Sequence, residues 1–165
     1  MKTLYLNRHA KSSWSNPSLD DFSRPLNKRG MRDAPFMGEL LSKKVSPPDI
    51  IYSSPANRAI TTATQIAEAF KYDVDKIVEK HSIYEAAVFD LINIIKSTSD
   101  EHDIVMIFGH NPTFTMASNY LTNKFIDNIP TSGFVQINFD FNSWNEVEGN
   151  SGKLVLFEYP KKYLK

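Results

Sequence analysis

Cysteine is absent from this 165-residue chain, so disulfides, thiolate metal sites and cysteine nucleophiles are all excluded. Long hydrophobic runs are missing too: none reaches the roughly 18 apolar residues of a membrane span, and Arg8 interrupts the short apolar run near the N-terminus before it could form a signal-peptide core. Charge of one sign is not in excess, because 19 basic residues balance 19 acidic ones. We therefore expect a cytoplasmic protein that binds neither nucleic acid nor a membrane, with any anion site confined to a local cluster.

The size and composition of the chain predict one domain. A hydrophobic content of 41% over 165 residues is enough for a single core. No linker rich in Pro, Gly or Ser divides the sequence, and no internal repeat is visible. We expect residues 1–165 to form one domain, and nothing in the sequence indicates an oligomeric state.

Apolar runs and helical patterns alternate along most of the chain. The runs at 4–6, 49–53 and 103–108 are typical of strands buried on both faces, as in a parallel sheet. Residues 134–141 instead alternate apolar with polar side chains, and 154–159 return after a turn, which predicts an antiparallel hairpin. The pattern predicts an α/β fold, a three-layer α/β/α sandwich with a mixed, mostly parallel sheet.

Capping signals mark where the helices should begin. Asn27 is an N-cap candidate for a helix that continues to about residue 45, with Pro35 either a kink or the true start. Ser54 and Asn111 each precede a proline, the arrangement expected of an N-cap followed by the first helical residue. We assign the Met and Phe residues to the core and interpret His81 as exposed, like His102.

A long stretch rich in turn formers, residues 11–26, follows the first strand. Long loops without secondary structure are uncommon in small domains and are often functional. This one leaves directly from Arg8 and His9, so we expect it to fold over them. Lys11 and Ser12 are close enough in sequence to contribute hydrogen-bond donors to a site there.

Side chains that can bind an anion follow three separate strands. Arg8 and His9 end the first, Arg58 opens the helix after the second, and His110 ends the third. Taken singly, Arg8 could be a solvated strand end, His9 a structural histidine and Arg58 an exposed side chain. Because the carboxyl ends of parallel strands share one edge of a sheet, we expect them to converge in a cationic pocket. Such a pocket suits phosphoryl transfer, in which catalysis is mostly positioning and electrostatics.

Arg58 adds a second sign of an anion. A cation in the first turn of a helix opposes the helix dipole, where an acidic residue is preferred. An anionic ligand bound at that helix start would remove the conflict.

Three sequence blocks together resemble the histidine phosphatase superfamily, which has the phosphoglycerate mutase-like fold. They are Arg8-His9-Ala10, the segment 53–59 (Ser-Ser-Pro-Ala-Asn-Arg-Ala) and the segment 109–112 (Gly-His-Asn-Pro). Their order and spacing match the family over nearly the whole chain. The short length and the Arg-His-Ala-Lys-Ser start look most like the small bacterial branch that includes the phosphohistidine phosphatase SixA.

The resemblance implies a role for each matching residue. His9 is the expected nucleophile, neutral, with its second ring nitrogen donating a hydrogen bond to a backbone carbonyl or a similar acceptor. The phosphoryl oxygens are expected to bind Arg8, Arg58 and His110, with His110 cationic when phosphate is present. No metal and no cofactor are implied, and the sequence has no metal-binding or nucleotide-binding motif.

The proton donor is less well defined by the sequence. The family often places an acidic residue between the second Arg and the second His, and Glu85 stands there. It could equally be a carboxylate that stabilises a helix N-terminus. Ser12, Lys11 and Asn111 are expected to add contacts to the substrate.

Two functions of different class are compatible with these residues. The first is a metal-independent phosphatase that acts on a phosphorylated small molecule or on a protein that carries phosphohistidine. The chain is too short for a large capping insertion, which favours an open pocket and disfavours a phosphoglycerate mutase. The second is a non-catalytic module that binds phosphate or a phosphoprotein on the same fold, although such a module does not need the nucleophile His9.

Overall fold

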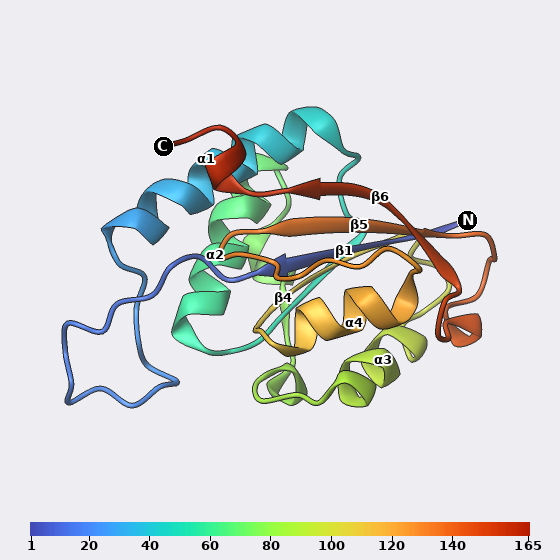
Figure 1. Cartoon of the computed structure of the whole chain (residues 1–165), viewed down its shortest axis with the longest axis horizontal. Helices are drawn as coiled ribbons and strands as arrows, with labels where there is room; N and C mark the ends of the chain where they lie inside the picture. Colours follow the sequence, from blue (N-terminus) through green and yellow to red (C-terminus); the bar gives the residue numbers. More distant parts are fainter.

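The computed structural model describes residues 1–165 and contains one six-stranded sheet with helices on both faces (Figure 1). The strands are β1 (Lys2–Arg8), β2 (Ile50–Ser53), β3 (Val78–Glu79), β4 (Ile104–Gly109), β5 (Phe134–Phe139) and β6 (Gly152–Glu158). Their order is β3-β2-β4-β1-β5-β6, in which β1 to β4 run parallel and β5 is antiparallel to both neighbours. The predicted α/β sandwich with a mixed, mostly parallel sheet is confirmed.

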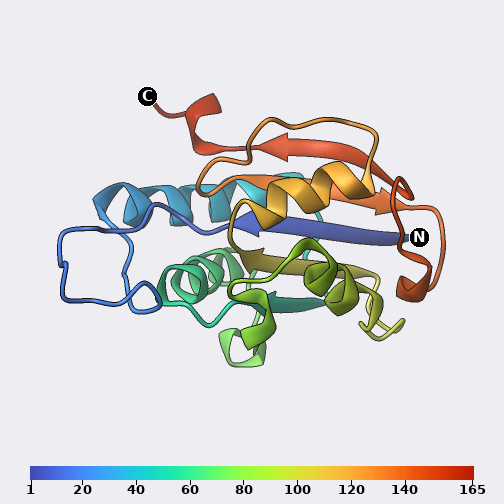
Figure 2. The ribbon, with the colours of Figure 1, turned by 60° about the horizontal axis from the view of Figure 1, so that its bottom comes forward.

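Two pairs of helices cover the two faces of the sheet (Figure 2). On one face α1 (Lys28–Lys44) and α2 (Asn57–Ala69) pack on the sheet; on the other lie α3 (Val88–Lys96) and α4 (Thr113–Leu121). Successive side chains of a strand point to opposite faces. Accordingly Leu4 and Leu6 of β1 join the core under α3 and α4, whereas Tyr5 joins the core under α1 and α2. This double burial explains the continuous apolar runs in the sequence.

Strand register brings the predicted site residues together. Arg8 at the end of β1 pairs with Gly109 at the end of β4, and Ser53 at the end of β2 pairs with Phe108. The three parallel strands therefore end at one level, and the residues that follow them share one edge of the sheet. The loop 11–26 extends from this edge, on the side of the molecule away from the N-terminus (Figure 1).

The first helix begins where the sequence indicates. The side chain of Asn27 accepts a hydrogen bond from the backbone N–H of Gly30 at 2.9 Å, which confirms Asn27 as the N-cap. Pro35 lies inside α1 and is therefore not its start.

The other two capping predictions are wrong in detail. Helix α2 starts at Asn57 with Ala56 as its N-cap, because the chain makes a turn after Ser54 before it becomes helical. Helix α4 has Pro112 as its N-cap. The side chain of Asn111 still accepts a hydrogen bond from the backbone N–H of Thr115 at 3.2 Å, so it satisfies a first-turn donor from one residue further out.

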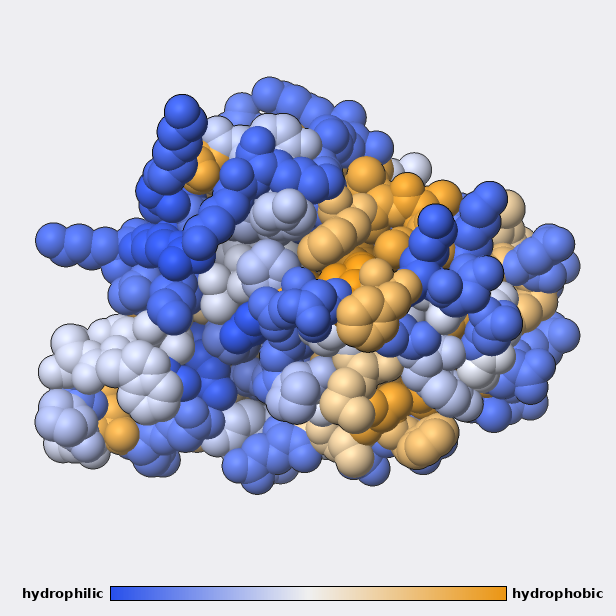
Figure 3. Space-filling view, in the orientation of Figure 1, coloured by the Kyte–Doolittle hydropathy of each residue, from blue (hydrophilic) through white to orange (hydrophobic).

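The assignment of every Met and Phe to the core is also wrong. Met31, Phe89, Met116 and Phe125 are 52%, 62%, 54% and 79% exposed. The inward face of α4 is already filled by other residues, which leaves Met116 on its outer side. Figure 3 shows apolar side chains on the face that includes α3, α4 and β6.

Two further predictions can be compared with the structure: the exposure of the histidines outside the motifs, and the lack of a membrane span. His81 is exposed as expected, whereas His102 is half-buried. No helix combines the length and apolar character required to span a bilayer.

Candidate active site

A cavity of about 230 Å³ opens at the carboxyl ends of β1, β2 and β4. Every predicted site residue except Glu85 contributes to its lining: Arg8, His9, Lys11, Ser12, Arg58, His110 and Asn111. The lining is almost wholly polar and strongly basic. The convergence expected from the parallel strands is therefore what the structure shows.

His9 is held in one orientation at the end of β1. Its Nδ1 lies 2.7 Å from the carbonyl oxygen of Ala10, and a carbonyl can only accept, so Nδ1 carries the ring proton. This arrangement leaves the lone pair on Nε2. Burial lowers the pKa of His9 to about 3, against the effect of the Ala10 hydrogen bond, and the positive charges nearby act in the same direction as burial. His9 is therefore neutral, as a nucleophile must be.

His110 faces His9 from the end of β4. The two ring centroids are 5.2 Å apart. Nε2 of His110 lies 2.8 Å from the hydroxyl oxygen of Ser54, while Nδ1 is buried and has no protein partner. Burial, followed by the charge of Arg58, lowers the pKa of His110 to about 4, so this ring is neutral in the ligand-free protein. The cationic form expected with phosphate bound stays a prediction.

The two guanidinium groups of the motifs are each anchored on one side only. Nη1 of Arg8 donates to the carbonyl oxygen of Ile129 at 2.9 Å. Arg58 donates from Nη1 and Nη2 to the backbone oxygen and the carboxylate of Asp21, at 2.7 and 2.9 Å. The Nε atoms of both arginines are buried without a partner. Buried polar nitrogens are normally paired, so the presence of Arg8, Arg58 and His110, each with one unpaired buried nitrogen, in one basic cavity lining indicates a site for an oxyanion.

Comparison with known proteins identifies the family. The sequence model of the histidine phosphatase superfamily (branch 1) matches residues 4–81. An uncharacterised chloroplastic protein of Arabidopsis thaliana is 32% identical, over 92% of this chain and 72% of its own length. An uncharacterised protein of Mycobacterium leprae is 31% identical, over 93% of this chain and 99% of its own. The chain belongs to the histidine phosphatase superfamily.

Solved structures place this member of the superfamily near one of its branches. A crystal structure of a protein assigned as the phosphohistidine phosphatase SixA of Agrobacterium tumefaciens has a TM-score of 0.78 and 29% identity, with 96% of this chain and 98% of that chain covered. A SixA structure complexed with tungstate has a TM-score of 0.82 at 16% identity, over 97% and 98%, and shows the shared fold. The chain is SixA-like in fold, and these neighbours support phosphatase activity in broad terms.

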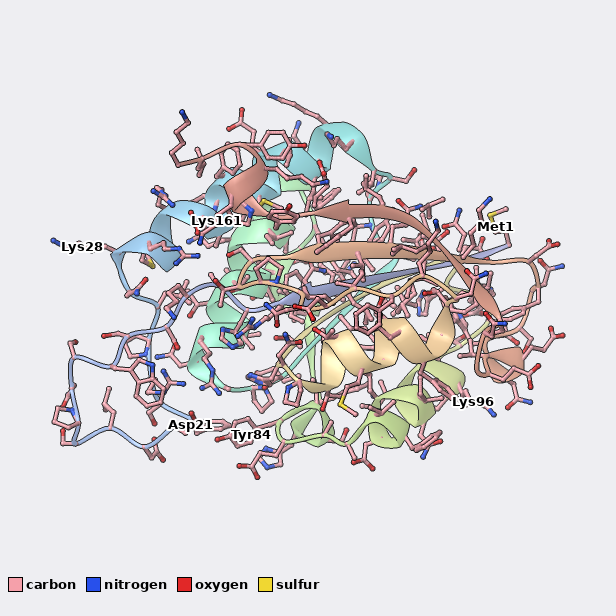
Figure 4. All side chains as sticks on the ribbon, viewed as in Figure 1. Met1, Asp21, Lys28, Tyr84, Lys96 and Lys161 are labelled. Carbon is pink, nitrogen blue, oxygen red and sulfur yellow. The ribbon has the colours of Figure 1, made fainter.

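The loop 11–26 of this histidine phosphatase supplies a residue that sequence reasoning missed. The Asp21 carboxylate accepts hydrogen bonds from Arg58, from Arg24 at 3.0 Å and from the hydroxyl of Tyr84 at 2.7 Å. Asp21 and Tyr84 are labelled in Figure 4, where they lie next to each other at the pocket end of the molecule. Burial opposes ionisation of Asp21, but these hydrogen bonds outweigh it and hold its pKa well below the usual range. The sequence did contain a signal for this contact, because the acidic pair Asp20 and Asp21 lies in a loop that is expected to cover a cationic pocket.

Arg24 and Trp14 of the same loop also line the cavity. Arg24 is 7% exposed, donates to the hydroxyl of Ser12 at 2.6 Å, and lies with its guanidinium carbon 3.6 Å from the ring centroid of Trp14. Trp14 itself is 74% exposed. Ser12 thus holds a third guanidinium beside the pocket, and an aromatic face forms part of the rim.

Asn111 and Lys11, two of the predicted substrate contacts, differ in whether their side-chain donors are already used in hydrogen bonds within the protein. The side-chain N–H groups of Asn111 already donate to Ile129 and Asn128, at 2.9 and 3.0 Å, so this residue supports the pocket wall. The ammonium of Lys11 has no hydrogen bond to the protein, and Lys11 lines the pocket. Lys11 is the better placed of the two to meet a ligand.

Glu85 lies outside the cavity lining in this structure. It does not open a helix, as the sequence suggested, because α3 begins at Val88 and the backbone N–H of Ala87 donates to Asp90 at 2.9 Å. Glu85 instead occupies a turn with a positive φ of 60° and is exposed. The chain after Tyr84 has to turn sharply here, and this turn displaces the helix start.

Proposed function

We propose that this chain is a metal-independent phosphatase that forms a covalent phosphohistidine on Nε2 of His9. One observation carries the proposal: Nε2 is the only ring nitrogen of His9 free to react, and His9 lines a pocket with three residues that each keep a buried nitrogen without a protein partner. Those residues are Arg8, Arg58 and His110. Together they offer positive charge where the equatorial oxygens of a transferring phosphoryl group would lie.

The reaction then has two displacement steps. In the first, the Nε2 lone pair of His9 forms a bond to phosphorus while the bond from phosphorus to the leaving group breaks, and the leaving group takes that electron pair and a proton. In the second, the oxygen of water bonds to phosphorus and the electron pair of the N–P bond returns to Nε2. The product is inorganic phosphate, which initially holds both protons of the water as H₂PO₄⁻.

Two residues near the pocket are candidates to donate the proton that the leaving group takes: Asp21 and Glu85. Asp21 is ionised because its pKa is held low, so it is a poor proton donor in the ligand-free state. Glu85 remains our proposal for the acid, although it would have to approach the pocket from its exposed turn.

We infer that the substrate is a phosphohistidine on a protein or a small phosphomonoester. The SixA neighbours, one of them described as a protein histidine phosphatase, support the first. Imidazole is a good leaving group, which lessens the need for a strong acid in the pocket. The non-catalytic binding module remains the competing proposal on the same fold.

The deciding experiment is labelling with a ³²P-labelled phosphoprotein or phosphoramidate, stopped with alkaline detergent because an acid quench would hydrolyse a phosphohistidine. We expect a labelled wild-type enzyme whose label is acid-labile and alkali-stable, as a phosphohistidine is. In His9→Ala the label should vanish and turnover should fall by at least about 10³-fold, since the nucleophile itself is lost.

His81→Ala is the matched control, because this histidine is exposed and lies outside the pocket lining. Its label and turnover should equal those of the wild type, and a chelator should leave both unchanged. Turnover that survives in His9→Ala would contradict the mechanism. Phosphate binding without turnover in the wild type would favour the binding module.

A further inference from the structure

The hydroxyl of Ser54 is the one group hydrogen-bonded to the ring of His110. Ser54 directly follows β2 and is fully buried. Its oxygen lies 2.8 Å from Nε2 of His110 and accepts a hydrogen bond from the backbone N–H of Ala56 at 3.2 Å. Ser54 is not part of the cavity lining, so it meets His110 from behind the pocket.

Counting protons at Ser54 settles the direction of the contact with His110. A serine hydroxyl donates one hydrogen bond and accepts up to two. The N–H of Ala56 can only donate, so it uses an acceptor site and leaves the hydroxyl proton in need of a partner. Nε2 of His110 is the remaining neighbour of the Ser54 oxygen and can accept that proton in a neutral ring.

We propose that Ser54 is a positioning residue that fixes His110 as the tautomer with its proton on Nδ1. Nδ1 is buried, has no protein partner and belongs to a ring that lines the pocket. The tautomer therefore leaves an N–H, and not a lone pair, as the unpaired group of a ring that lines the pocket. The reverse tautomer would leave the hydroxyl proton of Ser54 buried without an acceptor and would remove the N–H from Nδ1.

The contact also acts on the protonation of His110. A hydrogen bond donated to Nε2 exists only while that nitrogen carries a lone pair, so it favours the neutral ring. Ser54 therefore adds to burial in keeping His110 neutral before substrate binds. The inference deepens the proposed function, on which its catalytic consequence rests, but the tautomer itself is a property of the ligand-free protein.

The primary test is a long-range ¹H–¹⁵N NMR correlation of the histidine rings in ligand-free protein near neutral pH. We expect the His110 ring to show a protonated Nδ1 and an unprotonated Nε2 in the wild type. In Ser54→Ala the two tautomers should mix, and the pKa of His110 should rise. A wild-type His110 protonated on Nε2 overturns the proposal, and so does an unchanged tautomer in Ser54→Ala.

Ser53→Ala is the matched control. Ser53 is also fully buried, but its hydroxyl donates to the carbonyl oxygen of Ser54 at 2.9 Å and does not meet His110. We expect Ser53→Ala to keep the wild-type tautomer and kcat. In Ser54→Ala kcat should fall at least about tenfold with little change in KM, since a donor to the transition state becomes misaligned.

The two proposals fail separately. If the wild type has no turnover but shows the expected tautomer, the proposed function fails and the assignment of Ser54 stands. If turnover depends on His9 but His110 carries its proton on Nε2, the assignment of Ser54 fails alone.

Discussion

At the scale of single residues, the pocket is marked by donors that the protein leaves unpaired. A buried N–H without a partner costs about 1–3 kcal/mol, so natural structures contain few of them. Here Nε of Arg8, Nε of Arg58 and Nδ1 of His110 have no partner, and all three residues line one cavity. Under the proposed function these three residues bind the oxyanion, and interactions with it offset part of the cost of leaving polar groups unpaired.

Asp21 is the residue most directly in competition with such an anion. Its carboxylate is 2.9 Å from Nη2 of Arg58. We expect Asp21→Asn to bind inorganic phosphate several-fold more tightly, because a negative charge next to the bound anion is removed. The inhibition constant of phosphate as product measures the change, and raised salt should reduce the difference between the two proteins.

Asp20→Asn is the control for Asp21→Asn, because the Asp20 carboxylate is bonded to the backbone N–H of Ser23 and not to Arg58. Its phosphate inhibition should resemble that of the wild type. Weaker phosphate binding in Asp21→Asn would contradict the prediction, and would show that Asp21 chiefly orients Arg58 for the ligand.

At the scale of secondary-structure elements, the site is assembled by strand ends and by one loop. Arg58 lies in the first turn of α2, which contains no acidic residue. The sequence suggests that an anionic ligand would relieve this unfavourable charge at the helix start. In the structure the loop 11–26 supplies a negative charge at this position, through the carboxylate of Asp21.

The close approach of α1 to the start of this loop depends on Gly30. A Cβ at this position would overlap the carbonyl oxygen of Lys11, which also accepts a hydrogen bond from the N–H of Asn27 at 2.9 Å. We expect Gly30→Ala to destabilise the protein by roughly 1–3 kcal/mol, because backbone must move. Urea unfolding measures the loss, and turnover should fall as Lys11 and Ser12 shift.

Gly149→Ala is the control, since a Cβ there meets only the ring of Tyr120, at 3.0 Å, and that ring is partly exposed and can move. Its stability should stay within about 0.5 kcal/mol of the wild type. If Gly30→Ala is as stable and active as Gly149→Ala, α1 does not constrain the loop.

At the scale of the whole molecule, the two pocket histidines, His9 and His110, make stability depend on pH. The pKa of His9 is lowered to about 3 and that of His110 to about 4, whereas an unfolded histidine has a pKa of about 6.5. At pH values between the folded and unfolded pKa the unfolded chain binds protons that the folded protein does not. Stability is therefore lost as pH falls below about 6.5, by up to about 1.4 kcal/mol per pH unit for each histidine.

Removing one of these histidines should flatten that dependence. We expect His9→Gln to lose less stability than the wild type between about pH 6.5 and about pH 5, because one proton uptake on unfolding is gone. Urea unfolding at several pH values in this window gives the slopes. His81→Gln, at an exposed site, is the control for replacing a histidine, and equal slopes in His9→Gln and wild type would contradict the pKa assigned to His9.

The sequence by itself determined the architecture and most of the pocket. Strands buried on both faces read as continuous apolar runs, and parallel strands share a carboxyl edge, so Arg8, His9, Arg58 and His110 could be placed together from their positions alone. The orientation of His9 by a backbone carbonyl was also predicted, from the family resemblance, and the structure shows it.

Only the tertiary structure decided what surrounds those residues. The pairing of Asp21 with Arg58 depends on how the loop 11–26 folds back, and the contact of Ser54 with His110 depends on where the turn after β2 ends. Neither the loop path nor the end of the turn has a periodic signal in the sequence. Glu85 shows the same limit, because the turn after Tyr84 moves it away from a helix start. Local patterns define the elements, whereas partners far apart in sequence are chosen by packing in three dimensions.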